Sequence, residues 1–257
     1  MNNSVFGIES LHRLCKLSKY AYPPKARDDE KGQPLQSYVV QKDEIAKVGA
    51  ELLSVFEDKV NSVECYCVRI ILTVGGITRS TIVYTYRGTH GLRDLGTDIL
   101  ADMVKTSYGR VHLGFRRYYQ ISREWVLDTL RDIRYDYSEP VIANGHSLGG
   151  GGAANCALEN GFFLSTFGCP TIGDAESNVR IEELPGAVRC WQTFDRVAYA
   201  PSHWTNRILE TNYDWGPWKG CGQWVGFGRH GISGYEQKLA KRLSKIQFKR
   251  LRKLKGK

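Results

Sequence analysis

Hydrophobic and polar positions change along this chain in short runs, which predicts strands separated by helices. Two runs rich in β-branched and aromatic residues, 63–73 and 77–86, flank Gly75-Gly76, a pair typical of a hairpin turn. Helical patterns are expected over 11–22, 43–56 and 117–134, and further strands over 141–143, 162–167 and 188–194. Strands that alternate with helices after a first hairpin predict an α/β protein. Its sheet should be doubly wound and mostly parallel, with an antiparallel start.

The charged residues are unevenly distributed along the chain. The 257 residues, 42% of them hydrophobic, suit one large domain with a buried core. The formal net charge is +9, and ten basic residues with no acidic one lie between Lys238 and Lys257, so the rest of the chain is nearly neutral. Helical spacing places four leucines and Ile246 of this basic segment on one side, with Phe248 on the other. We therefore expect a single domain over 1–236 and a basic amphipathic tail over 237–257.

Three interpretations suit the tail. An anionic membrane surface would attract the basic side chains while the apolar ones insert shallowly. Nucleic acid would also attract the charge, but Phe248 is the only aromatic residue among the basic ones and no nucleic-acid-binding module is found. The third interpretation is a solvated basic end. The sequence favours the membrane surface over nucleic acid and leaves the oligomeric state open.

The N-terminus and the cysteines indicate the cellular compartment in which the protein is expected. Residues 1–10 lack the basic and apolar regions of a secretory leader, and no apolar run reaches the length of a transmembrane helix. Seven cysteines, an odd number with no paired framework, suit reduced thiols. These features predict an intracellular (cytoplasmic) location, with peripheral attachment to a membrane left open.

Candidate chemistry lies at Gly145-His146-Ser147-Leu148-Gly149, a G-x-S-x-G pattern between a strand-like run and a helix of small residues. Such a pattern places a serine on a sharp strand-to-helix turn, where flanking glycines leave room for the neighbouring strand and helix. The N–H of Leu148 would then point toward a developing oxyanion. A plain glycine-rich turn is the alternative. The four consecutive glycines at 149–152 predict close packing of the helix against the sheet.

A serine hydroxyl is a weak nucleophile until a base accepts its proton, and a carboxylate must orient that base. In proteins with this elbow the chain order is serine, acid, histidine, which leaves His203 and His230. His230, in a glycine-rich loop, is favoured. For the acid, Asp195 after a predicted strand is favoured. Asp174, better suited to capping a turn, and Asp214 are the alternatives.

Four segments together resemble the class 3 lipases of fungi and plants. They are the elbow and, in addition, Tyr86-Arg87-Gly88-Thr89, Val111-His112-Leu113-Gly114-Phe115 and Thr166-Phe167-Gly168-Cys169-Pro170. In that family the residue after the Arg-Gly pair supplies an oxyanion N–H. The resemblance therefore implies the α/β-hydrolase fold, Thr89 and Leu148 as oxyanion donors, and Asp195 within an Asp-x-Val step. It calls for no metal or organic cofactor, and the chain departs from the family where Thr171 follows Pro170.

The implied function is that of a serine carboxylic-ester hydrolase, with a triad of Ser147, Asp195 and His230 and an acyl-enzyme intermediate. The segment 92–100 holds the position of the family's lid, and an ordinary surface helix is the other interpretation. The expected partner is an acylglycerol-type lipid ester. Two alternatives remain: a phospholipase or galactolipase with the same mechanism, and a catalytically silent scaffold that binds lipid or protein.

Overall fold

The structure is a computed structural model that describes residues 5–22, 41–88, 103–133, 138–192, 194–195, 197–199, 222–226 and 231–255. Within these ranges seven strands form one sheet of order β1-β2-β3-β6-β7-β8-β9. Their bounds are Ala50–Asp58 (β1), Val63–Val74 (β2), Ile77–Tyr86 (β3), Val141–His146 (β6), Phe163–Phe167 (β7), Ala187–Gln192 (β8) and Gly222–Gly226 (β9). The first three strands pair antiparallel and the others parallel. This confirms the predicted mostly parallel sheet with an antiparallel start.

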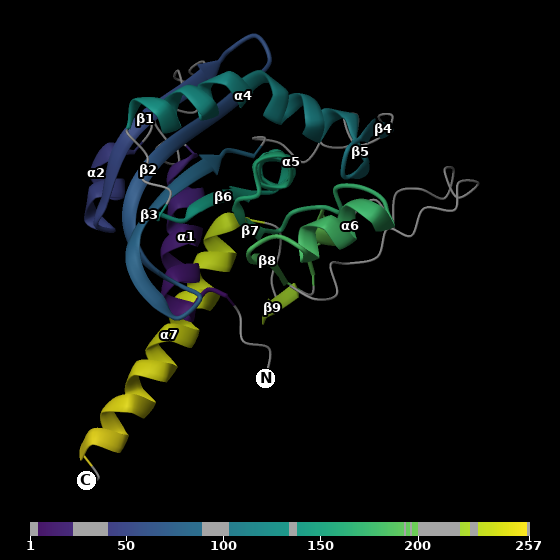
Figure 1. Ribbon diagram of the computed structural model, residues 1–257. Coiled ribbons are helices and arrows are strands. Elements are labelled where there is room, and N and C mark those ends of the chain that lie inside the picture. The colour runs from purple at the N-terminus through teal and green to yellow at the C-terminus, as the bar shows by residue number, and fades with distance from the viewer. Residues whose placement is uncertain are drawn as a thin grey trace, which may run out of the picture.

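Helices cover both faces of this sheet (Figure 1). They are α1 (Ile8–Tyr20), α2 (Lys42–Lys47), α4 (Leu113–Asp132), α5 (Leu148–Asn160), α6 (Ala175–Glu182), the 3₁₀ turn η2 (Val197–Tyr199) and α7 (Ile232–Lys255). Helices α1 and α7 pack on one face, while α4 and α5 pack on the other. A small hairpin of β4 (Met103–Thr106) and β5 (Gly109–His112) leads into α4.

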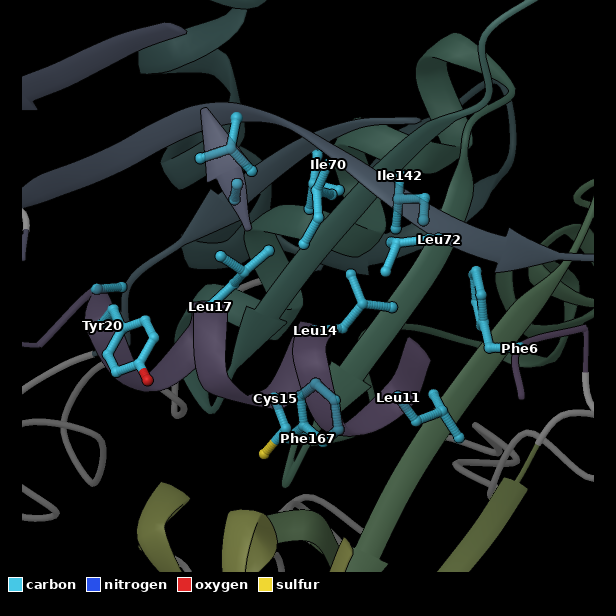
Figure 2. Packing of buried hydrophobic residues seen from close by; sticks show 14 of the residues in the cluster. Phe6, Leu11, Leu14, Cys15, Leu17, Tyr20, Ile70, Leu72, Ile142 and Phe167 are labelled. Carbon is cyan, nitrogen blue, oxygen red and sulfur yellow. The ribbon is translucent and has the colours of Figure 1, made fainter. Parts of the chain in front are cut away.

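The alternation of side chains along each strand divides the core into two layers. On β3, Val83 belongs to the core under α1, whereas Ile82 and Tyr84 belong to the core under α4. Figure 2 shows the first layer, in which three leucines of α1 at every third position face the sheet: Leu11, Leu14 and Leu17. This spacing gives α1 one apolar stripe, and burial of that stripe fixes the helix against the strands.

The predicted hairpin is confirmed, because β2 and β3 are joined by Gly75 and Gly76 with φ of 59° and 83°. The helix predicted over 43–56 is wrong, since α2 ends at Lys47 and strand β1 follows. Gly49, with φ of 69°, turns the chain between them. Pairing with β2 satisfies the backbone of β1 and overrides its helical pattern. The predicted lid segment 92–100 lies outside the described residues.

Helix α7 runs across the predicted boundary at 236. Its first turns place Ile232, Tyr235 and Leu239 in the core beside α1, and the rest extends away from the body (Figure 1). On that extension the Ile246 and Phe248 side chains are 37% and 62% exposed. Of the helices in the described part of the chain, none combines the length and the hydropathy that crossing a bilayer requires.

Candidate active site

Ser147 stands at the junction of β6 and α5 with a backbone conformation that L-residues seldom adopt. Its φ is 58° and its ψ is −130°, and Ser62 is the only other non-glycine residue with positive φ in the described chain. A β-strand that turns directly into a helix requires such a residue, and its strain is retained because the surrounding structure holds it. The predicted strand-to-helix elbow is present.

Glycines close this turn because no other residue fits. A Cβ on Gly145 would lie closer than 3.0 Å to the carbonyl of Gly149, and one on Gly149 would lie equally close to the carbonyl of Tyr86. The next glycines of α5 make contacts of the same kind: Gly150 with Cys169, Gly151 with Phe115 and Gly152 with Tyr118. The predicted close packing is confirmed, although Gly151 meets helix α4, and Gly152 meets both α4 and Tyr86 of β3.

The Ser147 side chain is only 1% exposed, and its Oγ has no hydrogen-bond partner among the described residues. Leu148 supplies the first N–H of α5, which has no acceptor within the helix. The helix dipole adds positive potential at this end. A buried hydroxyl and an N–H group at a helix N-terminus therefore stand together, as attack on a carbonyl and stabilisation of the resulting oxyanion require.

Asp195 is fully buried three residues after the end of β8. Its Oδ1 accepts the N–H groups of Val197 and Ala198 at 3.0 and 3.2 Å, and its Oδ2 accepts the Tyr235 hydroxyl at 2.5 Å. Burial first, and then the charge of Asp195, raise the pKa of Tyr235 well above its usual value, so the phenol remains a donor. Three hydrogen bonds hold the carboxylate in one orientation.

A buried arginine supports the loop that carries Asp195. Arg189 of β8 donates from Nε and Nη2 to the carbonyl of Cys169 at 3.1 and 2.9 Å, and from Nη2 to the carbonyl of Ala198. It therefore ties the segment after β7 to the segment after β8. Sequence reasoning missed Arg189 and Tyr235, because neither lies in a motif and their partners are distant along the chain.

The structure gives Asp174 a structural role. This residue is the N-cap of α6, where its Oδ1 accepts the N–H of Ser177 at 3.0 Å and its Oδ2 accepts the N–H of Arg110 at 3.0 Å. His112 acts in the same way for α4, since its Nδ1 accepts the N–H of Gly114 at 3.1 Å. Both carboxylate oxygens of Asp174 are thus already bound, as its predicted role in capping requires.

The other predicted site residues, Thr89, His230, His203 and Asp214, lie outside the described residues. The predicted site residues that the structure does describe lie at the same edge of the sheet, where its parallel strands end. Ser147 follows the carboxyl end of β6 and Asp195 follows that of β8, two parallel strands separated by β7. Open α/β sheets bind their ligands at this edge.

A cavity of about 750 Å³ lies at the opposite edge of the sheet. Its lining includes Val141 and Phe163, which begin β6 and β7, together with Arg79 and Pro140. Because Ser147 follows the other end of β6, the length of that strand separates the cavity from the candidate active site.

Comparison with known proteins gives a consistent result. A family model described as lipase (class 3) matches residues 83–204. A secreted mono- and diacylglycerol lipase 2 of Gibberella zeae is 39% identical over 72 residues, which cover 25% of this chain and 18% of that protein. A lipase of Rhizomucor miehei is 32% identical over 115 residues, 38% of this chain and 31% of that protein. The chain thus matches less than a third of the length of either relative.

Among solved structures, a triacylglycerol lipase whose catalytic centre is a serine-protease triad superposes with a TM-score of 0.57. The two chains are 21% identical, and the superposition covers 76% of this chain and 74% of that one. This likeness establishes the predicted α/β-hydrolase fold.

One prediction is contradicted. The sequence predicted an intracellular location, whereas the relative from Gibberella zeae is a secreted lipase. The cysteine argument fails for a physical reason: the six cysteines of the described residues are all free and buried. Burial alone keeps such thiols unreactive, so they carry no information on the redox state of a compartment.

Proposed function

The chain belongs to the class 3 lipase family, and on this premise we propose that it hydrolyses acylglycerol-type lipid esters as a serine carboxylic-ester hydrolase. The observation that carries the proposal is Ser147 itself, strained at a strand-to-helix turn, with a hydroxyl that no described residue engages. Among the buried serines of the described chain, Ser147 alone has a positive φ, and backbone strain of this kind is typically retained at functional sites.

In the proposed mechanism Ser147 Oγ attacks the ester carbonyl carbon while His230 accepts its proton. Asp195 orients the imidazole and stabilises its charge, and the N–H groups of Leu148 and Thr89 hold the oxyanion. Collapse of the tetrahedral intermediate breaks the bond to the alcohol, which leaves with the proton from His230. Water then repeats both steps on the acyl-enzyme and releases the fatty acid.

The choice of acylglycerols rests on the relatives. One is a mono- and diacylglycerol lipase and another, similar in fold, is a triacylglycerol lipase. Phospholipids and galactolipids carry the same ester bond, and hydrolysis of either by the same triad is the alternative within this mechanism. A silent scaffold of the family that binds lipid or protein is the alternative outside it.

The test compares wild type with two serine variants on nitrophenyl esters of increasing chain length. Ser147→Ala should abolish hydrolysis and leave the melting temperature within about two degrees, since it removes one hydroxyl and creates no cavity. Ser165→Ala is the matched control, because Ser165 is also buried and its Oγ also has no partner in the described chain. This control should retain full activity.

Retention of a tenth of the activity in Ser147→Ala would refute the triad. Inactivity of the wild type on every ester would favour the scaffold. His230→Ala should lower turnover at least about a thousandfold, whereas His203→Ala should keep most of it. A mixed-lipid digest analysed by mass spectrometry then identifies the substrate class.

We further propose that the extension of α7 binds an anionic lipid surface. This extension, residues 240–255, contains eight basic residues and no acidic one, and Ile246 and Phe248 are exposed on it. Each basic side chain near such a surface contributes about 1 kcal/mol of binding free energy. Attachment of this kind would hold the catalytic edge near aggregated substrate.

Removal of residues 244–257 tests this attachment and spares Leu239, which belongs to the core. The truncated protein should lose binding to vesicles rich in anionic lipid, and activity on them, while it keeps its turnover of a short soluble ester. Equal vesicle binding at low salt with and without the segment would refute the proposal. So would tight binding to duplex DNA, lost on truncation, with no binding to vesicles.

A further inference from the structure

A third segment meets the two that form the candidate active site. Tyr22 follows helix α1, and its hydroxyl lies 2.7 Å from Nδ1 of His146, the residue before Ser147. The same hydroxyl accepts the N–H of Gly88 at 3.1 Å. One partly buried tyrosine thus contacts both the end of β6 and the segment that follows β3.

The Tyr22 hydroxyl lies close to the backbone of both segments. A Cβ on Gly88 would lie closer than 3.0 Å to both the Tyr22 hydroxyl and the carbonyl oxygen of His146. The Tyr22 ring meets the His146 ring edge-on at 5.7 Å, and the Arg87 guanidinium lies 5.9 Å from its centre. Only glycine at position 88 therefore lets the two segments approach each other around this hydroxyl.

Arg87, in turn, is fixed from the other side. Its guanidinium pairs with Glu64 of β2, and its carbonyl accepts the Tyr118 hydroxyl of α4 at 2.6 Å. Burial raises the pKa of Tyr22, so its phenol remains protonated and has one proton to donate. His146 Nδ1 lies at hydrogen-bond distance, and the tautomer of this histidine sets the direction of the bond.

We propose that Tyr22 is a positioning residue. It sets the separation of the two backbone segments that, in the proposed mechanism, bind the oxyanion. Gly88 precedes Thr89, and His146 precedes Ser147 and Leu148. This inference rests on the proposed function and extends it to Tyr22, which follows α1 and lies outside the matched region 83–204. Oxyanion donors act only when they are aimed at the transition state, so an error in this separation should lower turnover more than substrate binding.

The experiment is Tyr22→Phe, which keeps the ring and removes the hydroxyl. Its matched control is Tyr66→Phe, because the Tyr66 hydroxyl likewise lies in the α1 region, where it donates to the Leu17 carbonyl at 2.5 Å. Tyr22→Phe should lower kcat for a soluble nitrophenyl ester by about 30-fold and change KM by less than about twofold. Tyr66→Phe should keep kcat within about twofold of wild type, although its melting temperature should fall about as much as that of Tyr22→Phe.

A boronic acid that forms a tetrahedral adduct with Ser147 provides a second measurement. Tyr22→Phe should weaken its affinity by the same factor as kcat, whereas a purely structural role would leave the affinity unchanged in the folded fraction. Labelling of Ser147 by a fluorophosphonate should slow in parallel, and this measurement needs no lipid substrate. It therefore tests the role of Tyr22 even if the proposed ester class is wrong. A kcat and a labelling rate within about twofold of wild type, or equal losses in both variants, would overturn the inference.

Discussion

The nucleophile and the acid of the candidate active site are held in opposite ways. Ser147 owes its geometry to the glycines on either side of it, since a Cβ on Gly145 would press on the Gly149 carbonyl and the turn closes only without it. Asp195 owes its geometry to distant groups, because Tyr235 binds it from helix α7 and Arg189 binds the loop beyond it.

This difference determines how each side responds to change. The elbow is packed so closely that a single added carbon atom has no room, so it should tolerate almost no substitution. The acid accepts hydrogen bonds from three separate donors of the described chain, and loss of one leaves the others in place. We therefore expect all-or-none effects at the elbow and graded effects around the acid.

The largest effect we expect at the acid is that of Asp195→Asn. An amide keeps one acceptor but carries no charge, and its NH₂ group would face either the Tyr235 hydroxyl or the N–H groups of Val197 and Ala198 in place of an acceptor. Turnover of a soluble ester should fall at least about a thousandfold, equivalent to about 4 kcal/mol of transition-state stabilisation. Steady-state kinetics on the purified variant measures this loss.

Asp174→Asn is the control for that variant, because Asp174 also accepts two backbone N–H groups. Asparagine is a good N-cap, so this variant should lose only about 1 kcal/mol of folding stability and keep most of its activity. A greater loss of activity in Asp174→Asn than in Asp195→Asn would reassign the acid and remove the contrast between the two sides.

The next effect is that of Gly149→Ala, which tests whether the elbow is as intolerant as its packing implies. The new methyl group would press on the Tyr86 carbonyl, part of the sheet backbone, and should cost about 3 kcal/mol of folding stability. Gly161→Ala provides the comparison, since Gly161 has φ of 66° but no atom within 4 Å of its Cβ position. It should cost about 1 kcal/mol. Equal losses in thermal or urea unfolding would contradict the packing argument.

The same contrast explains what the sequence revealed about the site. The elbow could be predicted because its requirements lie within five consecutive residues, and Asp195 could be proposed because it follows a strand. Tyr22 and Tyr235 could not be predicted, since each is an ordinary aromatic residue until the fold brings it to His146 or Asp195. Contacts across 124 and 40 residues leave no local pattern.

Prediction of the fold succeeded and failed for similar reasons. The β2–β3 hairpin and the parallel order of the sheet followed from turn glycines and alternating strands and helices. The segment 43–56 was misread as one helix because its later part has a helical pattern but becomes β1 by pairing with β2. Such pairing depends on a partner strand and is invisible in the residues of the segment itself.

The smallest effect concerns Tyr235→Phe, which removes one hydrogen bond to Asp195 and leaves the ring packed near Phe167 and His146. We expect kcat to fall about tenfold with little change in KM, because the carboxylate keeps both backbone donors but gains freedom to turn. The pKa of Tyr235 is raised well above its usual value, so the wild-type hydroxyl is a donor throughout the neutral range and the ratio of the two kcat values should be constant from about pH 6 to pH 9. Tyr84→Phe is the control, since it removes a buried hydrogen bond of 3.0 Å to the Val126 carbonyl on the other face of the sheet. A thousandfold loss of kcat in Tyr235→Phe would mean that the acid depends on a single distant contact as strictly as the nucleophile depends on its glycines. The two sides of the site would then not differ in how they are held.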